Sequence, residues 1–397
     1  MTIVRVTMDQ PANAAGCASS RIARVVVFDT LAAAEPHWRR LQCPPHSSTF
    51  YQRFEFLSAW QRHVGERRAF APFIAVAFDA EGEPLMVLPL VSTRILGLRY
   101  AFFMGGKHSN FNMPLYRRYF AASATPADLA DLIAALRRHV PRIDVLAFTQ
   151  QPVSWHGIPN PLSLLPRQPS VNVYPRLTFP ADGKPDAAIS TSLRRRLKDK
   201  ERKLQALPGY RHVVATGEAD IQRMVDTFFR LKPAHMAAQK LPNVFAEPGV
   251  EEFVRDICRQ RDADAGPLVV LHALECEDEV IALYAGMEDG QRYTMMFNTY
   301  TLSANARYSP GLILMRHIVD HYAARGFRML DLGIGEADYK RMFCKEQDPV
   351  FDSFLPLTAR GHIGAAALSA LHRAKHMIKQ SPRLLTVVSG LRRALRR

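Results

Sequence analysis

Residues 293–343 read YTMMFNTYTLSANARYSPGLILMRHIVDHYAARGFRMLDLGIGEADYKRMF and decide the fold. Their hydrophobic pattern predicts, in order, a strand ending at Asn298, a polar loop, a helix over 311–324 and a short strand over 328–332. Ser309 is a natural N-cap for this helix, and Pro310 suits its first position. Because the first N–H groups of a helix are free and carry the positive end of its dipole, this start favours a phosphate or pyrophosphate. A well-capped helix without a ligand explains the same residues equally well.

A loop with two glycines follows the second strand. It reads Asp331-Leu332-Gly333-Ile334-Gly335 and leads into Asp338-Tyr339-Lys340. Glycines at the end of a strand let the backbone approach a ligand closely. The alternative is a plain turn in which Asp331 acts only as a cap. The spacing does not match the G-x-G-x-x-G pattern of dinucleotide-binding folds.

The order of elements occurs twice along the chain. The first half is expected to hold strands and helices at 24–28, 54–64, 73–78, 84–91, 99–104, 126–139 and 143–148. The second half repeats them at 212–215, 218–231, 249–260, 268–274, 280–286, 292–298, 311–324 and 328–332. The hairpin turns FDAEGEPL (78–85) and LECEDEVI (274–281) match at an offset of 196 residues. The pattern therefore predicts an α/β protein with an internal duplication.

The combination of Tyr308-Ser309-Pro310-Gly311 with Asp331-x-Gly333-x-Gly335-x-x-x-Tyr339-Lys340 resembles the acetyltransferases of the GNAT superfamily. More closely, it resembles their duplicated FemAB-like branch, with CelD-type acetyltransferase domains, over most of 50–355. The resemblance implies an α/β fold of tandem GNAT-like (acyl-CoA N-acyltransferase) domains, each a mixed central sheet flanked by helices. The expected ranges are 1–20 for a flexible N-terminus, 21–155 for a degenerate first domain, 156–210 for a Pro-rich linker and basic helix, 211–358 for the catalytic domain and 359–397 for a basic amphipathic tail.

The same resemblance implies an acyl-CoA donor, most simply acetyl-CoA, whose pyrophosphate is held by the backbone of the loop and helix start. The residues expected to hold it are Arg307, Ser309, Pro310, Gly311 and Leu312. GNAT loops usually carry repeated glycines here, whereas this loop offers only Gly311. Some FemAB-like proteins use aminoacyl-tRNA instead of acyl-CoA. Both donors therefore stay open at this point.

Attack of an amine on a thioester needs a base, an acid for the leaving thiolate and a donor to the tetrahedral oxygen. The candidates for these catalytic roles are Tyr339, Lys340, Asp338 and Tyr308. The residues expected to bind substrate are Asn298, Tyr300, Asp331, Gly333, Gly335 and His235, the last of which follows a helix expected to break at Pro233. The alternatives are a packed aromatic ring for Tyr339, a solvated charge for Lys340 and a structural histidine for His235.

The first half has a comparable loop at 105–114 but lacks the Ser-Pro-Gly helix start. We interpret this half as the degenerate copy. Its loop is expected to contribute acceptor contacts through Lys107, His108, Asn110 and Asn112. A glycine-rich loop without a ligand is the alternative.

The net charge of +15 is concentrated in two segments. Residues 191–211 carry a net charge of +6 and residues 361–397 carry +8, so the rest of the chain is nearly neutral. The first segment is either a solvated helix face or a site for RNA phosphates. The second is amphipathic and predicts either binding to an anionic membrane surface or packing of its apolar side onto the domain.

Five scattered cysteines fit reduced thiols, and their spacing predicts no metal site. The N-terminus lacks the apolar core of a signal peptide, so a cytoplasmic protein is expected, with a possible peripheral place at the inner membrane.

The favoured function is transfer of an acyl group to an amine of a small sugar or amino-acid-like acceptor, for example in envelope or exopolysaccharide synthesis. The alternatives are a FemAB-type transferase that uses aminoacyl-tRNA and a non-catalytic GNAT-like scaffold in a polysaccharide synthesis complex.

Overall fold

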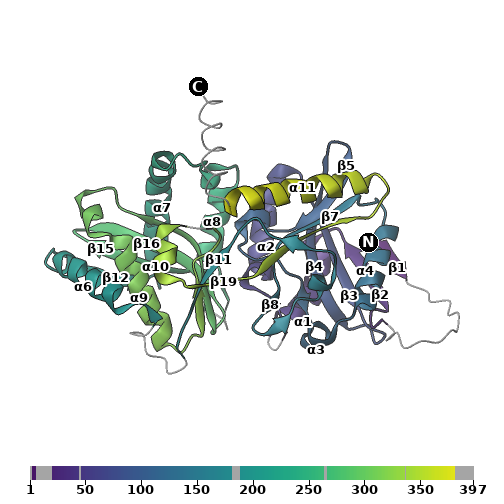
Figure 1. Cartoon of the computed structure of the whole chain (residues 1–397), viewed down its shortest axis with the longest axis horizontal. Helices are drawn as coiled ribbons and strands as arrows, with labels where there is room; N and C mark the ends of the chain where they lie inside the picture. Colours follow the sequence, from purple (N-terminus) through teal and green to yellow (C-terminus); the bar gives the residue numbers. More distant parts are fainter. Residues whose placement is uncertain are drawn as a thin grey trace. The chain divides into compact units, whose positions relative to one another are not determined.

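The structure is a computed structural model of the 397-residue chain, and it describes residues 2–5, 20–43, 46–180, 188–262, 266–335 and 337–380. The described residues fall into two compact units, which Figure 1 shows coloured along the chain. The first unit takes its residues from 1–61, 68–173 and 349–397. The second takes them from 62–67 and 174–348.

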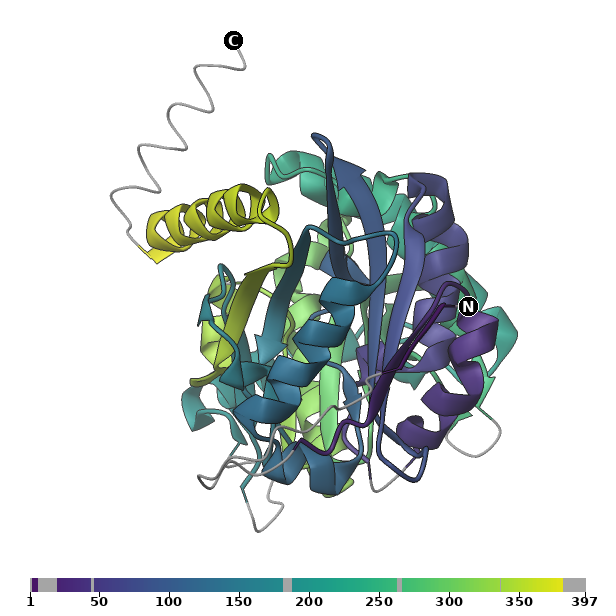
Figure 2. The same ribbon diagram turned by 90° about the vertical axis from the view of Figure 1, so that its right-hand side faces the viewer.

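The first unit is a mixed sheet with helices packed on it. Its strands are β1 (Thr2–Arg5), β2 (Arg24–Phe28), β3 (Ala71–Phe78), β4 (Pro84–Ile95), β5 (Leu98–Phe103), β6 (Leu115–Tyr116), β7 (Val145–Pro152), β8 (Ser154–Trp155), β9 (Ile158–Pro159), β10 (Gln168–Pro169) and β20 (Val350–Pro356). Its helices are α1 (Leu31–Gln42), α2 (Phe54–Trp60), α3 (Arg118–Ser123), α4 (Pro126–Arg138) and α11 (Gly361–Gln380). The main sheet has the order β1-β2-β3-β4-β5-β7-β20-β10, and β6 pairs with β4. Helix α11 packs against β7 and β20, and α1 against β3 and β4 (Figure 2).

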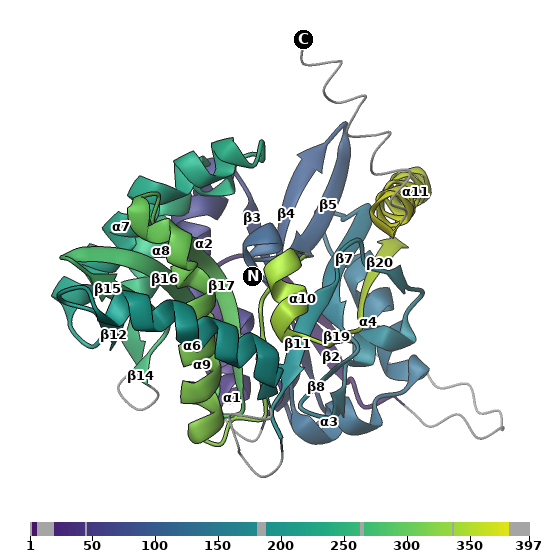
Figure 3. The same ribbon diagram turned by 60° about the vertical axis from the view of Figure 1, so that its left-hand side comes forward.

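The second unit has the same kind of sheet. Its strands are β11 (Tyr174–Thr178), β12 (Arg211–Val214), β13 (Arg261–Asp262), β14 (Gly266–Pro267), β15 (Val270–Cys276), β16 (Glu279–Glu288), β17 (Arg292–Tyr300), β18 (Met329–Asp331) and β19 (Glu346–Asp348). Its helices are α6 (Thr191–Gln205), α7 (Glu218–Ala238), α8 (Val250–Arg259), α9 (Pro310–Ala324) and α10 (Asp338–Phe343). The main sheet has the order β12-β15-β16-β17-β18-β11-β19. Helices α6 and α9 pack together on the sheet, and α7 packs with α8 (Figure 3).

The two sheets share one arrangement. The order β2-β3-β4-β5-β7-β20 in the first corresponds to β12-β15-β16-β17-β18-β11 in the second. In both sheets a parallel pair occupies the same place, β5 with β7 and β17 with β18, whereas the neighbouring pairs are antiparallel. The predicted α/β fold with an internal duplication is confirmed.

In each sheet, the strand that follows the parallel pair comes from a distant part of the chain. Strand β11, which follows the first half, pairs antiparallel with β18, and β20, which follows the second half, pairs antiparallel with β7. The units therefore differ from the expected ranges 21–155, 156–210 and 211–358, which followed chain order. The stretch expected to link the domains contributes β10 to the first sheet and β11 to the second. A hydrophobic pattern identifies a strand but does not specify which sheet edge it joins.

The predicted strands and helices are present, with shifts of a few residues at their ends. One local prediction is wrong, because α7 does not break at Pro233 but continues to Ala238. Burial of residues along this helix, from Ile221 to His235, holds it together past the proline. Residues 6–19 of the expected flexible N-terminus and residues 381–397 of the expected tail lie outside the described residues. Within the described ranges, no helix has the length and apolarity needed to cross a membrane.

Candidate active site

Strands β17 and β18 run side by side for a short distance and then separate. Their pairing covers three positions and ends at Thr294 with Asp331, although β17 continues to Tyr300. An irregularity lies just beyond, because Gly286 of β16 pairs with Met295 while Ala285 pairs with Phe297. This leaves Met296 as the extra residue of a β-bulge, which turns the strand and re-aims the side chains that follow. The end of β17 thus offers an open backbone edge beside β18.

Two polar side chains meet at this edge. Asn298 of β17 donates a hydrogen bond from Nδ2 to the hydroxyl oxygen of Tyr339 in α10, at 3.2 Å. Because Asn298 occupies a lone pair of that oxygen, the Tyr339 hydroxyl keeps its own proton free to donate. Burial raises the pKa of Tyr339 to about 12, so the phenol stays protonated at neutral pH. The arrangement suits proton donation to a leaving group.

Helix α7 brings a lysine and a histidine to the same end of β17. Lys232 donates from Nζ to the backbone oxygen of Asn298 at 3.0 Å, and burial lowers its pKa to about 8. His235 Nδ1 lies 3.0 Å from Thr299 Oγ1, and its ring lies 4.3 Å from that of Tyr300. The buried Nε2 of His235 has no hydrogen-bond partner in the structure. Burial and the nearby Lys232 lower the pKa of His235, so the ring is neutral at pH 7 and Nε2 can accept a proton.

The start of α9 lies next to this cluster. A Cβ placed on Gly311 would lie 3.8 Å from Cδ1 of Tyr300 and 3.9 Å from the hydroxyl of Tyr284, which is ordinary contact distance. Pro310 occupies the first helical position, as predicted. Ser309 is the N-cap residue, as predicted, but it has φ 58° and its side chain makes no capping bond. Its Oγ instead accepts a hydrogen bond from Lys200 Nζ of α6 at 2.7 Å.

The remaining residues of the predicted donor loop lie at different depths. Arg307 is exposed, with its guanidinium 4.8 Å from the centre of the Tyr308 ring. Tyr308 packs partly buried against the apolar core, and Leu312 is likewise partly buried in the first turn of α9. These placements leave Gly311 and the free backbone of the helix start closest to the end of β17.

The glycine loop is held by Lys340. This lysine is buried and donates from Nζ to the backbone oxygens of Gly333 and Ile334, at 3.1 and 2.7 Å. Gly333 and Gly335 have φ of 72° and 87°, a region that favours glycine. Burial lowers the pKa of Lys340 to about 8. We interpret Lys340 as the residue that positions its neighbour Tyr339 by tying α10 to the loop.

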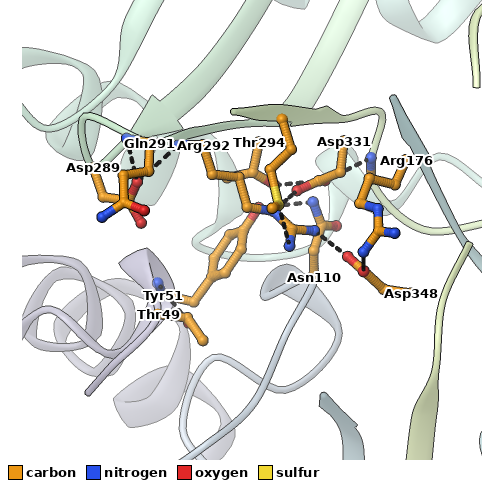
Figure 4. Close-up of polar contacts among 12 residues, drawn as sticks. Thr49, Tyr51, Asn110, Arg176, Asp289, Gln291, Arg292, Thr294, Asp331 and Asp348 are labelled. Atoms are coloured by element: carbon orange, nitrogen blue, oxygen red, sulfur yellow. Dashed lines mark hydrogen bonds and ion pairs between the residues drawn. The ribbon is translucent and has the colours of Figure 1, made fainter. Parts of the chain in front are cut away.

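Asp331 belongs to a buried ion cluster beneath the site (Figure 4). Its carboxylate is fully buried, accepts from Arg292 Nε at 2.8 Å and from Thr294 Oγ1 at 2.7 Å, and accepts the Gly333 N–H at 3.1 Å. Arg292 also pairs with Asp348 of β19, which Arg176 of β11 contacts at 2.6 Å. The cluster therefore joins four strands, and this placement does not support the substrate contact expected for Asp331. Burial raises the pKa of Asp331, an effect that Arg292 opposes.

Asp338 lies away from the cluster. Its side chain is 90% exposed and pairs with Arg341 one turn along α10. The predicted role of holding or deprotonating the amine is not supported by this position. The structure thus brings Tyr339, Asn298, Tyr300, His235 and Gly311 together and leaves Asp338 and Asp331 apart.

Sequence reasoning missed Lys232 and Tyr284. Lys232 is preceded one turn earlier by Phe228 and followed by His235, so a basic residue on an apolar helix face was the available signal. Tyr284 is buried and pairs in register with Asn298 across β16 and β17. Its position depends on the bulge, which the sequence pattern does not reveal.

A basic groove of about 630 Å³ runs along α6. Its walls include Ser192, Arg195, Arg196, Lys200 and Lys203 of α6, together with Met342 and Lys345. The five cations form no ion pair with another described residue, and the single acid, Asp199, pairs with Arg202. Through Lys200 and Ser309 the groove adjoins the start of α9. Clustered cations without counter-charges favour an anionic ligand.

The loop of the first unit, 105–114, is hydrogen-bonded to the rest of that unit. Asn110 donates to the hydroxyl of Tyr51 at 2.7 Å, and Asn112 donates to the backbone oxygen of Thr149 at 3.1 Å. His108 Nδ1 accepts from the Trp60 indole at 3.0 Å, and Lys107 is exposed. These contacts fit the alternative of a structural loop. Across the described residues, no group of His, Cys, Asp and Glu side chains is arranged to hold a metal ion.

Replacing Lys232 with methionine should stabilise the second unit at pH 7 by about 1–2 kcal/mol, because the folded state holds a charge that burial disfavours. The folded pKa of about 8 lies below the unfolded value of about 10.4, so the wild type gains stability as pH rises between them. The difference in unfolding free energy between Lys232→Met and the wild type should therefore shrink towards pH 10. Urea unfolding at pH 7 and pH 10 measures this difference, with the exposed Lys198→Met as control. A variant no more stable than the wild type at pH 7 would contradict this account.

Three comparisons bear on the family. Residues 191–341 match the model of the acetyltransferase (GNAT) domain family. No curated protein sequence matches the chain. Among solved structures, FemX is similar with a TM-score of 0.53 at 8% identity, over 80% of this chain and 95% of that chain. L-PGS from Bacillus licheniformis has a TM-score of 0.46 at 11% identity, covering 80% and 96% of the two chains. A tandem GNAT protein from the clavulanic acid biosynthesis pathway has a TM-score of 0.40 at 11% identity, covering 84% and 98%. Residues 191–341 therefore match the acetyltransferase (GNAT) domain family, and the chain shares its fold with FemX.

Proposed function

We propose that the chain transfers an acyl group, acetyl in the simplest case, from acyl-CoA to an amine of a sugar or amino-acid-like acceptor. The observation that carries the proposal is the separation of β17 from β18 beyond Thr294, next to the start of α9. An open strand edge offers backbone N–H groups to a thioester oxygen and to the chain that leads from it. A helix start offers further N–H groups to a pyrophosphate.

The groove on α6 supports an anionic donor. Lys200 contacts Ser309 directly before α9, so its positive charge lies beside the proposed pyrophosphate site. Arg195, Arg196 and Lys203 continue the positive charge along α6. A CoA molecule carries phosphates at the end away from its thioester. We assign that end to the groove.

The chemistry needs two proton transfers. The acceptor amine attacks the thioester carbon, and the carbon–sulfur bond breaks as the amide bond forms. In this proposal His235 Nε2 takes the proton from the amine, and Tyr339 gives its hydroxyl proton to the leaving thiolate. The neutral ring of His235 and the high pKa of Tyr339 match these roles. Lys340 keeps α10 in place and so positions Tyr339.

The acceptor class rests on the resemblance to FemAB-like and CelD-type proteins. That resemblance favours an amine on a sugar or amino-acid-like molecule of envelope or exopolysaccharide synthesis. The scattered cysteines, which fit reduced thiols, favour a cytoplasmic site of action. The similarity to FemX in fold agrees with the same branch.

Aminoacyl-tRNA is the second candidate donor. The groove favours it, because five cations without counter-charges would suit an RNA backbone as well as a CoA phosphate. The two donors differ in salt response, since binding that neutralises several RNA phosphates weakens steeply as salt rises.

Titration calorimetry of the full chain with acetyl-CoA tests the proposal. The wild type should bind in the micromolar range, and Gly311→Glu should weaken binding about tenfold or more, because a carboxylate would meet the pyrophosphate at the helix start. The matched control Gly311→Ala should bind like the wild type, since its Cβ has room. An acidic residue in the first turn favours the helix, so weaker binding would not reflect unfolding.

Three other results would contradict the proposal. Salt-sensitive tRNA binding without acetyl-CoA binding would favour the aminoacyl-tRNA transferase. Binding of neither ligand would favour a non-catalytic scaffold. Equal acetyl-CoA binding by Gly311→Glu and the wild type would remove the start of α9 from the donor site.

A further inference from the structure

The hairpin between β4 and β5 in the first unit ends in large apolar side chains. Ile95 closes β4 and is 51% exposed, and Leu96 at the tip is 99% exposed. Arg94 beside them is also exposed. Polar residues and glycine usually form such tips. Two adjacent aliphatic side chains, one fully and one half exposed to water, are therefore a feature that needs a partner.

Helix α11 presents a second exposed apolar surface. Ile363, Leu371 and Met377 are 75%, 48% and 59% exposed, and their spacing places them on one side of the helix. The sequence from 361 onward contains no acidic residue. Arg373 and Lys375 are exposed and form no ion pair with a described residue. Among the described residues, Arg373 donates a hydrogen bond to the neutral side chain of Gln168, which leaves its charge uncompensated there.

The hairpin and the start of α11 are in direct contact. A Cβ placed on Gly364 would lie 2.8 Å from Leu98 Cδ1 and from the hydroxyl of Tyr100, both in β5. The absence of a side chain at Gly364 thus lets α11 lie tightly against β5, next to the tip. Figures 1, 2 and 3 show the hairpin tip and α11 at the same end of the first unit.

We propose that these two elements form a docking face for an anionic lipid bilayer. The face consists of the apolar residues Ile95, Leu96, Ile363, Leu371 and Met377 and the cations Arg94, Arg373 and Lys375. The apolar side chains would enter the interface between headgroups and acyl chains, and the cations would meet the anionic headgroups. The inference concerns where the first unit attaches and does not depend on the reaction of the second.

The charge of the face selects this partner over a second copy of the chain. A symmetric dimer through the face would bring its cations against the same cations of the other copy, with no acid on α11 to offset them. An anionic bilayer supplies the opposite charge over the whole surface. The apolar residues alone would not make this distinction.

Co-sedimentation of the full chain with lipid vesicles tests the proposal. Vesicles of phosphatidylcholine with about 30% phosphatidylglycerol should bind the chain, and pure phosphatidylcholine should bind it at least about tenfold more weakly. Leu96→Asn should weaken binding to the mixed vesicles about tenfold through lost insertion. Asparagine tolerates the left-handed backbone at this position, so the variant should fold. Arg373→Gln and Lys375→Gln should each weaken binding about fivefold.

The matched control is Leu164→Asn. Leu164 is 48% exposed in the turn Pro161–Leu164, which packs against α4 on the same unit. It should bind vesicles like the wild type. Equal binding by Leu96→Asn and Leu164→Asn, or equal binding to neutral and mixed vesicles, would overturn the proposal. So would self-association that is lost in Leu96→Asn, measured by analytical ultracentrifugation, without vesicle binding.

Discussion

Replacing Tyr339 with phenylalanine should lower the turnover number about 100-fold while the KM for acyl-CoA changes by less than about threefold. The variant loses only the hydroxyl that accepts the hydrogen bond of Asn298, so the ring still packs in place. Without that proton the thiolate must leave as an anion or take its proton from water. Steady-state kinetics at saturating acceptor measures the effect, with the exposed Tyr119→Phe of the first unit as control.

The pH profile separates catalysis from a structural defect. Wild-type activity should rise with pH as His235 loses its proton, with a midpoint below its usual 6.5 because burial lowers the pKa of this histidine. It should then stay level well into the alkaline range, because burial raises the pKa of Tyr339 to about 12. A Tyr339→Phe variant that keeps its turnover number would show that another group protonates the thiolate. A midpoint that stays unchanged in His235→Gln would exclude His235 as the base.

Replacing Arg292 with methionine should lower the free energy of unfolding of the second unit by about 3–5 kcal/mol. The substitution leaves Asp331 fully buried without its cation, and Asp348 keeps only Arg176. Removing one partner of a buried pair costs more than the pair contributes, because the other charge stays out of water. Denaturant unfolding followed by circular dichroism measures the loss.

Two further variants test the cause. Arg325→Met removes a more exposed pair with Glu288 and should cost less than about 1 kcal/mol. Adding Asp331→Asn to Arg292→Met should recover part of the loss, because the amide keeps a hydrogen-bonding oxygen for Thr294 without a buried charge. If Arg292→Met and Arg325→Met lose the same stability, the cluster does not hold the four strands together.

The sequence predicts most of the elements because their signals are local. The continuous apolar runs of β3 and β4 on either side of a turn, and the helical periodicity of α4 and α9, depend only on neighbouring residues. The sheet that β11 joins, and the sheet that β20 joins, could not be predicted in this way. Each strand completes a sheet whose other strands lie far away in the chain, and pairing at that distance leaves no periodic trace.

The candidate site was predictable where a motif fixes a backbone conformation. Such positions are Gly333, Gly335 and Pro310, which opens α9. The residues that follow them in the sequence include Tyr339 and Gly311, so the motif identified these two as candidates. The depth of a charged side chain is set by tertiary packing instead. Asp331 and Asp338 lie seven residues apart, yet one is fully buried and the other 90% exposed. Lys232 gave a weak signal because its burial arises from residues of β17 far along the chain.

The exchange of strands also has a consequence for synthesis. During translation, every strand of the second main sheet is available once β19 has left the ribosome, because β11 is synthesised before the others. The first sheet must wait for β20, although most of its strands are the first to emerge. The N-terminal half therefore spends the longest time with an open β7 edge, which is a hazard for aggregation until the last strand arrives. The half that is translated second is the half that can fold first.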